Sequence, residues 1–336
     1  MAKILITTGI YPPKIGGPAQ YAKNLKLAFE SQGNTIAVKT YNLENYLPTG
    51  FHHAYFFLKI IPKILSSDWV LALDTFSVGL PTVLASKIFR KKCLIRTGGD
   101  FLWEQYVERT GKKIMFRNFY KEELERLSIK EKIIFNLTQW TLNKADGIVF
   151  STDWQREIFI SAYNLKEDKT FVVENYYGSK EGIFEPNSKV FVASTRILKW
   201  KNLDTIKKVW NRIKTSYPDA ELFTKNLPYP KFMEKIKHSY AIVQVSLGDI
   251  SPNMILDAIR YNKPFICTKE IGIYDRIRDI GIFVNPLNEE EIENAILKLL
   301  DPEEYKRVID KIKQFNFTHT WQEMAGKFID IYKNLK

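Results

Sequence analysis

Short apolar runs alternate with longer amphipathic segments along almost the whole chain. The apolar runs have the length and composition of buried β-strands, and they lie at residues 3–8, 35–40, 69–73, 93–96, 147–151, 190–194, 220–224, 241–245, 263–268 and 281–284. The amphipathic segments predict helices, among them 19–31, 52–65, 153–163, 203–215, 289–300 and 302–314. Because strands that alternate with helices form parallel sheets with right-handed crossovers, the pattern predicts an α/β protein.

The length of the chain divides this pattern into two parts. A chain of 336 residues exceeds one typical domain, and 45% hydrophobic residues suffice for two cores. We expect the boundary near residues 165–175. Cys93 and Cys267 lie far apart in apolar runs, so they are expected to be reduced core residues. The four histidines lack metal-ligand spacing, which argues against a zinc site.

The charge of the chain indicates anionic partners. A net charge of +12 attracts nucleic acid, anionic lipid or phosphorylated substrates. Residues 112–145 combine bases with aromatic residues, which is typical of amphipathic helices that lie on an anionic membrane. Acidic residues interleaved with these bases fit the alternative of a solvated helix face. The chain shows no signal peptide and no apolar run near the ~18 residues that span a bilayer, so we expect a cytoplasmic protein.

The stretch from Val245 to Pro264 combines a turn, a helix start and two carboxylates. Ser251 is a favourable N-cap and Pro252 suits the first helical position. Asp257 falls outside the buried stripe of this predicted helix, on the same side as Asn253. A helix N-terminus attracts phosphate, and a carboxylate beside it can accept hydrogen bonds from sugar hydroxyls. The alternative is that Asp249 belongs to an ordinary turn and Asp257 to a solvated helix face.

Three further strand ends carry candidate chemistry. The first strand leads into a Gly-rich loop that contains Gly16 and Gly17 and then into a helix, which is how α/β folds build phosphate sites, although the spacing is not the dinucleotide fingerprint. Asp100 follows the strand at 93–96. This carboxylate could orient or deprotonate an acceptor hydroxyl, or could cap the helix that follows. After the strand at 190–194, Arg196 and Lys201 supply two cations suited to a diphosphate.

Three of these stretches, at residues 245–264, 9–21 and 194–203, together resemble family 4 glycosyltransferases of the GT-B fold. That family has Glu, seven residues and Glu where this chain has Asp249 and Asp257, each one methylene shorter. The family's Gly-x-Pro turn is Asn262-Lys263-Pro264 here. The Arg and Lys of the family are kept, while its following Gly is Asn202.

The resemblance implies two Rossmann-like parallel-sheet domains that face each other across a cleft, with a C-terminal helix that crosses back to the first domain. Residues 1–170, completed by 319–336, would bind the acceptor. Residues 171–318 would bind the nucleotide-sugar, in a domain trimmed by about one strand–helix unit. The turn that begins the second domain contains Asn175. No Asp-x-Asp motif is present, which fits a metal-independent enzyme without a cofactor.

The resemblance also implies roles for the candidate residues. Arg196, Lys201, Asp249 and Asp100 would act in catalysis. The donor, a UDP- or GDP-sugar, would be bound by Gly16, Gly17, Asp257, Ser251, Pro252, Asn253, Met254 and Asn175. The reaction would retain the anomeric configuration and transfer a sugar to a glycan or lipid-linked acceptor, in synthesis of a cell-surface polysaccharide or glycoconjugate. Independently of the resemblance, the basic segment at 112–145 would allow peripheral association with the inner face of the membrane.

Three other functions remain open at this point. A nucleotide-sugar epimerase of the same fold would need no acceptor. A catalytically silent relative could bind nucleotide, glycan or a partner enzyme, and the change of both Glu residues to Asp motivates this alternative. A nucleic-acid-binding protein is suggested by charge alone, and because no recognition motif supports it, we expect no nucleic-acid partner.

Overall fold

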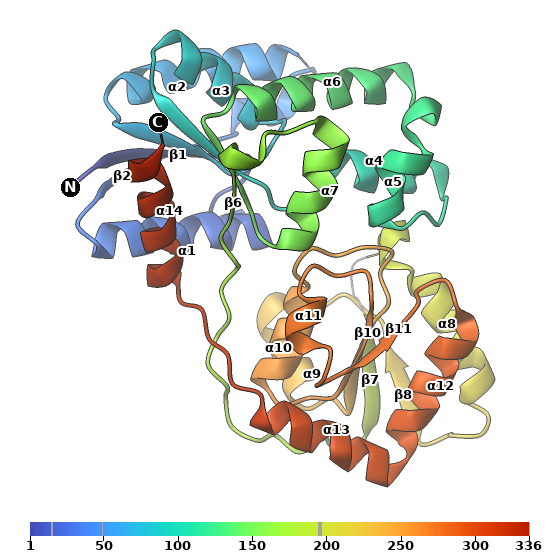
Figure 1. Ribbon diagram of the computed structural model, residues 1–336. Coiled ribbons are helices and arrows are strands. Elements are labelled where there is room, and N and C mark those ends of the chain that lie inside the picture. The colour runs from blue at the N-terminus through green and yellow to red at the C-terminus, as the bar shows by residue number, and fades with distance from the viewer. Residues whose placement is uncertain (15, 49, 194–196, 336) are drawn as a thin grey trace. The chain divides into compact units, whose positions relative to one another are not determined.

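The computed structural model describes residues 1–14, 16–48, 50–193 and 197–335. These residues form two compact units (Figure 1). The first unit comprises residues 1–102, 124–176 and 319–336, and the second comprises 103–123 and 177–318. Arg196, a predicted catalytic residue, lies outside the described residues. Among the described helices, none has the length and hydropathy required to cross a bilayer.

The first unit is built on a parallel sheet in the order β2-β1-β3-β4-β5-β6. Its strands are β1 (Lys3–Thr8), β2 (Thr35–Thr40), β3 (Trp69–Ala72), β4 (Lys92–Arg96), β5 (Gly147–Phe150) and β6 (Thr170–Val172). The central strands β3 and β5 are buried at every residue. Parallel strands covered on both faces need apolar residues at successive positions, which explains the continuous apolar runs in the sequence.

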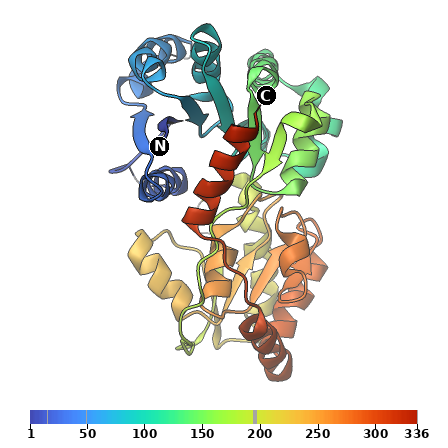
Figure 2. The ribbon, with the colours of Figure 1, turned by 60° about the vertical axis from the view of Figure 1, so that its left-hand side comes forward.

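Helices cover both faces of this sheet. On one face lie α1 (Gly17–Ser31) and α14 (Trp321–Asn334), which pack against each other (Figure 2). On the other face lie α2 (Phe51–Leu65), α3 (Gly79–Ile88) and α6 (Ile129–Lys144), with α3 in contact with both neighbours. Helix α7 (Asp153–Tyr163) follows β5. The 3₁₀ segments of this unit are η1 (Leu43–Tyr46), η2 (Leu124–Arg126) and η3 (Glu167–Lys169).

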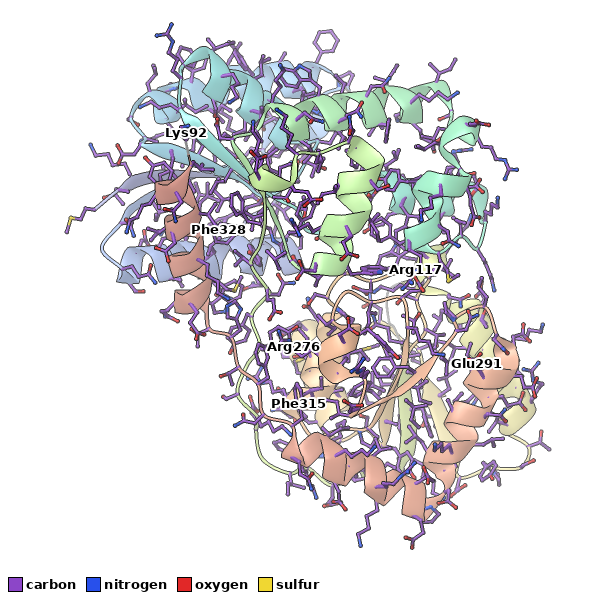
Figure 3. The ribbon with its side chains drawn as sticks, viewed as in Figure 1. Lys92, Arg117, Arg276, Glu291, Phe315 and Phe328 are labelled. Atoms are coloured by element: carbon purple, nitrogen blue, oxygen red, sulfur yellow. The ribbon has the colours of Figure 1, made fainter. Side chains whose placement is uncertain are left out.

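The C-terminal helix α14 completes the core of the first unit. Phe328, labelled in Figure 3, is fully buried, and its ring packs edge-on against Phe29 with centroids 6.3 Å apart. Tyr332 stacks on Trp69 of β3 at 5.0 Å. A capping box between Thr320 and Glu323 fixes the start of the helix. The last residues of the chain therefore belong to the same core as the first, as expected from the resemblance.

The second unit has a parallel sheet in the order β11-β10-β9-β7-β8. Its strands are β7 (Lys189–Ala193), β8 (Ala220–Phe223), β9 (Ala241–Gln244), β10 (Phe265–Thr268) and β11 (Ile282–Val284). Its helices are α8 (Leu203–Ile213), α9 (Tyr229–Lys237), α10 (Asn253–Arg260), α11 (Tyr274–Ile277), α12 (Glu289–Leu300) and α13 (Pro302–Gln314), with the 3₁₀ turn η4 (Lys199–Lys201). Chain order therefore places β8 directly before α9 and β9, without a further strand between them.

Residues 103–123 pack with the second unit, which the sequence pattern did not indicate. They include most of α4 (Phe101–Thr110) and all of α5 (Phe116–Glu122), and they group with the second unit although the chain before and after them belongs to the first. The basic and aromatic segment at 112–145 was predicted to form one or two amphipathic helices. The structure divides it, because α5 belongs to the second unit and α6 to the first.

Candidate functional site

The sheet of the second unit reverses its strand order between β7 and β9. The chain begins at β7, adds β8 on one side and then places β9, β10 and β11 on the other. In open parallel sheets, ligands bind at the carboxyl ends of strands where such a reversal occurs. The segment after β7 supplies Lys201, and the segment after β9 supplies Asp249. Two of the predicted catalytic residues therefore come from the two strands that flank this position.

Lys201 and Asp249 are held together as an ion pair. The Lys201 Nζ donates to Asp249 Oδ2 at 2.6 Å, and Gln244 Nε2 donates to the same oxygen at 2.8 Å. Their side chains are only 12% and 14% exposed. The ammonium also lies 4.2 Å from the ring centroid of Trp200. The lysine is therefore fixed in position before any ligand arrives, with its charge balanced by one carboxylate.

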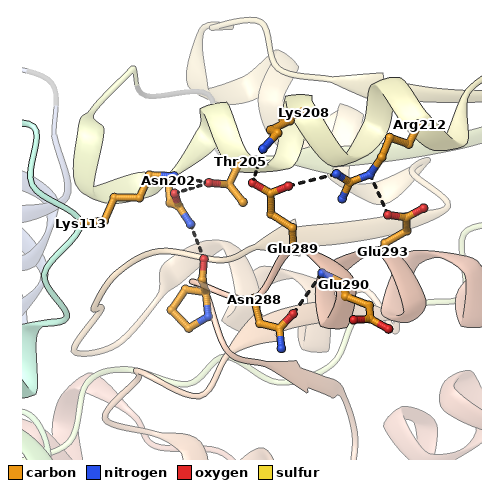
Figure 4. A network of polar contacts seen from close by, with 10 residues as sticks. Lys113, Asn202, Thr205, Lys208, Arg212, Asn288, Glu289, Glu290 and Glu293 are labelled. Carbon is orange, nitrogen blue, oxygen red and sulfur yellow. Dashed lines mark hydrogen bonds and ion pairs between the residues drawn. The ribbon is translucent and has the colours of Figure 1, made fainter.

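Asn202 stabilises the turn that presents Lys201. Its backbone has φ 56° and ψ 31°, the left-handed region that Gly and Asn adopt most readily, which explains why Asn replaces the Gly of the resembling family. The buried Asn202 Nδ2 donates to the carbonyls of Val245 at 3.2 Å and Pro286 at 2.7 Å. Figure 4 shows this amide and the ion pairs of Arg212 with Glu289 and Glu293 nearby. One side chain thus connects the loops that follow β7, β9 and β11.

The loop that carries Asp249 is supported by the segment after β10. The Asp249 N–H donates to the Glu270 carbonyl at 2.9 Å, and the Gly272 N–H donates to the Asp249 carbonyl at 3.1 Å. The Glu270 carboxylate accepts from Arg117 Nε at 2.6 Å (Arg117 is labelled in Figure 3). Burial raises the pKa of Glu270, and Arg117 opposes that rise. The carboxylate therefore orders the backbone that holds Asp249 in place.

Residues 103–123 contact the same loop from another direction. The Phe116 N–H donates to the Leu247 carbonyl at 3.1 Å. A Cβ built on Gly248 would lie 2.5 Å from the Cβ of Phe116 and 3.2 Å from the Trp103 ring, so this position accepts no side chain without displacement. Trp103 also packs against Trp200, with centroids 5.6 Å apart. The loop between β9 and α10 is therefore packed on both of its sides.

Helix α10 begins one residue later than its sequence pattern predicts. Pro252 has extended backbone angles, and its carbonyl accepts the N–H groups of Ile255 and Leu256 at 3.0 and 3.1 Å, so Pro252 occupies the cap position. The prediction that Ser251 caps the helix is wrong, because Ser251 lies one residue outside it. Within the described residues, the buried Ser251 hydroxyl has no hydrogen-bond partner, and the first-turn N–H groups of Asn253 and Met254 donate to no acceptor. This N-terminus can therefore receive a ligand.

Asp257 is a largely desolvated carboxylate. Among the residues that the structure describes, it accepts no hydrogen bond and forms no ion pair. Burial raises the pKa of Asp257 to about 6, Arg260 opposes this rise, and Glu181 adds to it. Arg260 forms its own ion pair with Glu181. A carboxylate left in such surroundings is costly to the fold and is typical of a ligand-binding position.

The other predicted site residues lie in the first unit. Gly16 is the cap residue of α1, its carbonyl accepts the N–H groups of Ala19 and Gln20 at 3.1 Å each, and Gly17 begins the helix. This loop follows β1, which lies at the corresponding reversal of strand order between β1 and β3. A Cβ on Gly16 would lie 3.1 Å from Ile10 Cδ1. The residue before Gly16 lies outside the described range.

Asp100 and Asn175 occupy separate places in the first unit. Asp100 is buried immediately before α4 and lines a small pocket with Phe76, Phe101 and Tyr163. Asn175 Oδ1 accepts from Arg96 Nη2 at 2.6 Å. The structure therefore engages Asn175 with a neighbouring arginine, and it places Asp100 in a different part of the same unit.

Comparison of the sequence with protein-family models and with curated proteins gives no match. Solved structures, in contrast, match over nearly the whole chain. Sucrose-phosphate synthase from Thermosynechococcus elongatus is 12% identical with a TM-score of 0.67, covering 100% of this chain and 99% of that one. HepE from Anabaena, solved with UDP and glucose, is 14% identical with a TM-score of 0.66, covering 100% of both chains. A putative UDP-N-acetylglucosamine 2-epimerase from Listeria monocytogenes is 14% identical with a TM-score of 0.63, covering 99% and 96%.

The chain has the GT-B fold. The prediction of two Rossmann-like parallel-sheet units with a C-terminal helix in the first is confirmed. Within this GT-B fold, the second unit brings Lys201 and Asp249 together at the strand reversal, and it contains α10 with Asp257.

Sequence reasoning missed three polar residues around the Lys201–Asp249 pair. Gln244 is the buried last residue of β9. A polar side chain at the end of an apolar run is a sequence pattern from which it could have been predicted. Glu270 follows β10 by two residues, which is again a strand end. Arg117 gave no signal, because its sequence neighbours do not show that it reaches Glu270. Among the described residues, no cluster of ligating side chains could hold a metal ion.

Proposed function

We propose that this chain is a glycosyltransferase that moves a sugar from a nucleotide-sugar donor to an acceptor. The observation that carries the proposal is the Lys201–Asp249 pair at the strand reversal of the second unit, where the loop leads into a helix with unused N–H groups. These groups suit a diphosphate. Structural neighbours support the same class, because one is a sucrose-phosphate synthase and another was solved with UDP and glucose.

The donor would be bound by groups of different chemistry. The first-turn N–H groups of Asn253 and Met254, with Lys201, would bind the diphosphate, and Arg196 remains a prediction in the same role. The Asp257 carboxylate has unused acceptor capacity for ribose hydroxyls. Asp249 holds Lys201 through Oδ2 and would bind the transferred sugar through its other oxygen. We propose a UDP- or GDP-sugar as the donor.

The same groups would lower the barrier to transfer. As the glycosidic bond breaks, negative charge develops on the leaving phosphate. Lys201 is already fixed by Asp249, so no reorganisation is required at that moment, and one preorganised donor of this kind is worth about 3 kcal/mol. We infer a retaining, metal-independent reaction from the resemblance of the site stretches to family 4 glycosyltransferases. The acceptor would be a glycan or a lipid-linked molecule of cell-surface polysaccharide or glycoconjugate synthesis.

Turnover with UDP- and GDP-sugars and a mixed glycan acceptor tests the proposal. Lys201→Ala should lower turnover about a hundredfold, because it removes a charge that acts on the leaving group. Lys208→Ala is the matched control, because Lys208 is an exposed lysine of the same unit that pairs with Glu289. Unchanged turnover in Lys201→Ala, with both variants folded, would remove Lys201 from the reaction.

Two other functions use the same site. A neighbour described as a UDP-N-acetylglucosamine 2-epimerase favours an epimerase, which would change the donor sugar without an acceptor. Analysis of the sugar product in the absence of acceptor separates the two reactions. The shorter carboxylates Asp249 and Asp257 favour a silent nucleotide- or glycan-binding protein. Ligand binding without any product would identify that case.

A further inference from the structure

Three adjacent helices of the first unit expose apolar side chains on their outer side. Helix α3 lies between α2 and α6 and packs against both (Figure 1). The exposed side chains that form this α2–α3–α6 face are Phe51, Tyr55, Leu58, Leu65, Leu84, Ile88, Ile129, Ile133 and Trp140. Single exposed apolar residues are ordinary, whereas a gathering of this size on neighbouring helices marks an interaction surface. The exposed Leu43 and Tyr46 of η1, which packs against α2, extend it.

Helix α2 shows most clearly that the exposure is systematic. Its exposed residues Phe51, Tyr55, Leu58, Pro62 and Leu65 recur every three or four positions, so they form one line along the helix. The opposite line, Phe56, Ile60 and Ile64, is buried in the protein. A helix packed on a sheet normally carries polar residues along its outer line. Helix α2 is therefore apolar on the side that the fold covers and on the side that it leaves open.

Helix α6 repeats the arrangement. Ile129, Ile133 and Trp140 are exposed along one line, with Asn136 between them. Ile129 is 82% exposed although it begins the helix directly after the Ser128 cap. The capping box explains the helix start but not the apolar residues on its outer side.

The exposed charged residues of these three helices are lysines. In α2, α3 and α6, all of whose residues the structure describes, Glu131 is the one acidic residue, and it is 6% exposed within the Ser128 capping box. The whole chain has 38 acidic residues in 336, so their near absence from three surface helices is selective. The lysines of these helices are Lys59, Lys63, Lys87, Lys130, Lys132 and Lys144. Lys59 pairs with Glu44 and Lys87 with Asp146, whereas the other four make no ion pair with the described residues.

We propose that the α2–α3–α6 face binds an anionic lipid bilayer. Apolar and aromatic side chains of an interfacial helix enter the boundary between headgroups and acyl chains, while lysines remain with the lipid phosphates. A second copy of the chain would bring lysines against lysines, so the charge of the face favours an anionic surface over self-association. The inference rests on this surface alone and holds whether or not the chain transfers sugar.

This surface differs from the segment that sequence alone indicated. For residues 112–145 the sequence left open either membrane docking or a solvated helix face. In the structure Lys112 pairs with Glu123, Arg117 with Glu270, and Lys113 bonds Thr205 in the second unit. These three basic side chains are therefore engaged by groups of the second unit. Helix α6 of this segment is part of the proposed membrane-binding face. Helices α2 and α3 also belong to the face because their apolar side chains are exposed, which the sequence pattern did not show.

Vesicle flotation of the whole chain tests the proposal. Phosphatidylcholine vesicles should bind it weakly, and binding should rise with the fraction of phosphatidylglycerol and fall with salt. Leu58→Ser and Ile133→Ser should each lower the partition coefficient about tenfold. Lys130→Gln and Lys132→Gln should each lower it about fivefold. Leu27→Ser on α1 and Lys311→Gln on α13 alter exposed residues elsewhere and should leave partitioning unchanged.

A site-specific probe separates insertion from general adsorption. Cys93 and Cys267 are both fully buried, so a cysteine placed at an exposed position can be labelled selectively. An environment-sensitive dye on Leu58→Cys should brighten and shift to the blue with anionic vesicles, whereas the same dye on Leu27→Cys should not.

Each contrary outcome overturns the proposal. Failure of the folded protein to bind anionic vesicles at low salt would do so. Binding that the four face variants leave intact would do so as well, because another surface would then be responsible. Concentration-dependent dimers that Leu58→Ser dissociates, without vesicle binding, would assign the face to a second copy of the chain.

Discussion

Replacement of Asp257 by Asn should make the protein more stable at neutral pH. The Asp257 carboxylate lies in largely desolvated surroundings, accepts no hydrogen bond from the described residues, and has a neighbouring arginine that is engaged by Glu181. Asn has nearly the same shape and no charge. The substitution therefore removes the cost of ionisation without opening a cavity.

The size of the effect follows from the pKa. The native pKa is raised from 3.8 to about 6, so between these pH values the native state keeps a proton that the unfolded chain has lost. Native stability thus falls as pH rises from about 4 to about 6, and the loss at pH 7 approaches 3 kcal/mol for two pKa units. Because Asp257 keeps some contact with solvent, which screens its charge, we expect Asp257→Asn to raise the free energy of unfolding by about 1–3 kcal/mol at pH 7 and by almost nothing at pH 4.

Urea unfolding of the parent and variant at pH 4, 5, 6 and 7 measures this difference. Asp310→Asn, at an exposed position of α13, is the matched control and should change stability little at any of these pH values. The reasoning is refuted if Asp257→Asn destabilises the protein at pH 7, or if its effect is the same at pH 4 as at pH 7. Either result would mean that other groups stabilise the Asp257 carboxylate in the native state.

Two further predictions concern the loop that carries Asp249. Gly248→Ala should lower the free energy of unfolding by about 1–3 kcal/mol, because the new methyl group would lie 2.5 Å from Phe116 Cβ; a urea midpoint equal to that of the parent would show that the loop yields freely. Arg117→Met should weaken nucleotide binding about fivefold, measured by calorimetry, because it removes the partner that holds Glu270 behind Asp249, whereas Arg307→Met on α13 should have no effect. Equal affinities in these two variants would separate Arg117 from the site.

Much of the fold could be predicted because parallel strands carry a strong local signal. Strands buried on both faces are apolar at successive positions, so β3, β5 and β9 are visible in the sequence without knowledge of their neighbours. The ends of these strands locate the loops in which ligands bind, and the resemblance to family 4 glycosyltransferases pointed to Lys201 and Asp249 within two of these loops. That the two side chains bond each other across 48 positions was not predictable, because it depends on the order of strands in the sheet.

Other features depend on tertiary packing that no local pattern expresses. The segment at 103–123 has ordinary amphipathic helices, and nothing in their periodicity shows that they group with the second unit. Ser251 and Pro252 satisfy the rules for a helix start, yet the backbone angles of Pro252 place the cap at the proline itself. The isolation of Asp257 depends on Glu181 occupying Arg260, and those two residues are 79 positions apart.

The most direct measurement of the proposed donor site is calorimetric titration of the folded protein with UDP, GDP and ADP. We predict that one of these nucleotides binds, and that Asp257→Asn and Lys201→Ala each weaken its binding about tenfold or more while Lys208→Ala does not. Absence of binding by all three nucleotides at millimolar concentration, or binding that both site variants leave unchanged, would contradict a nucleotide-sugar site at the strand reversal of the second unit.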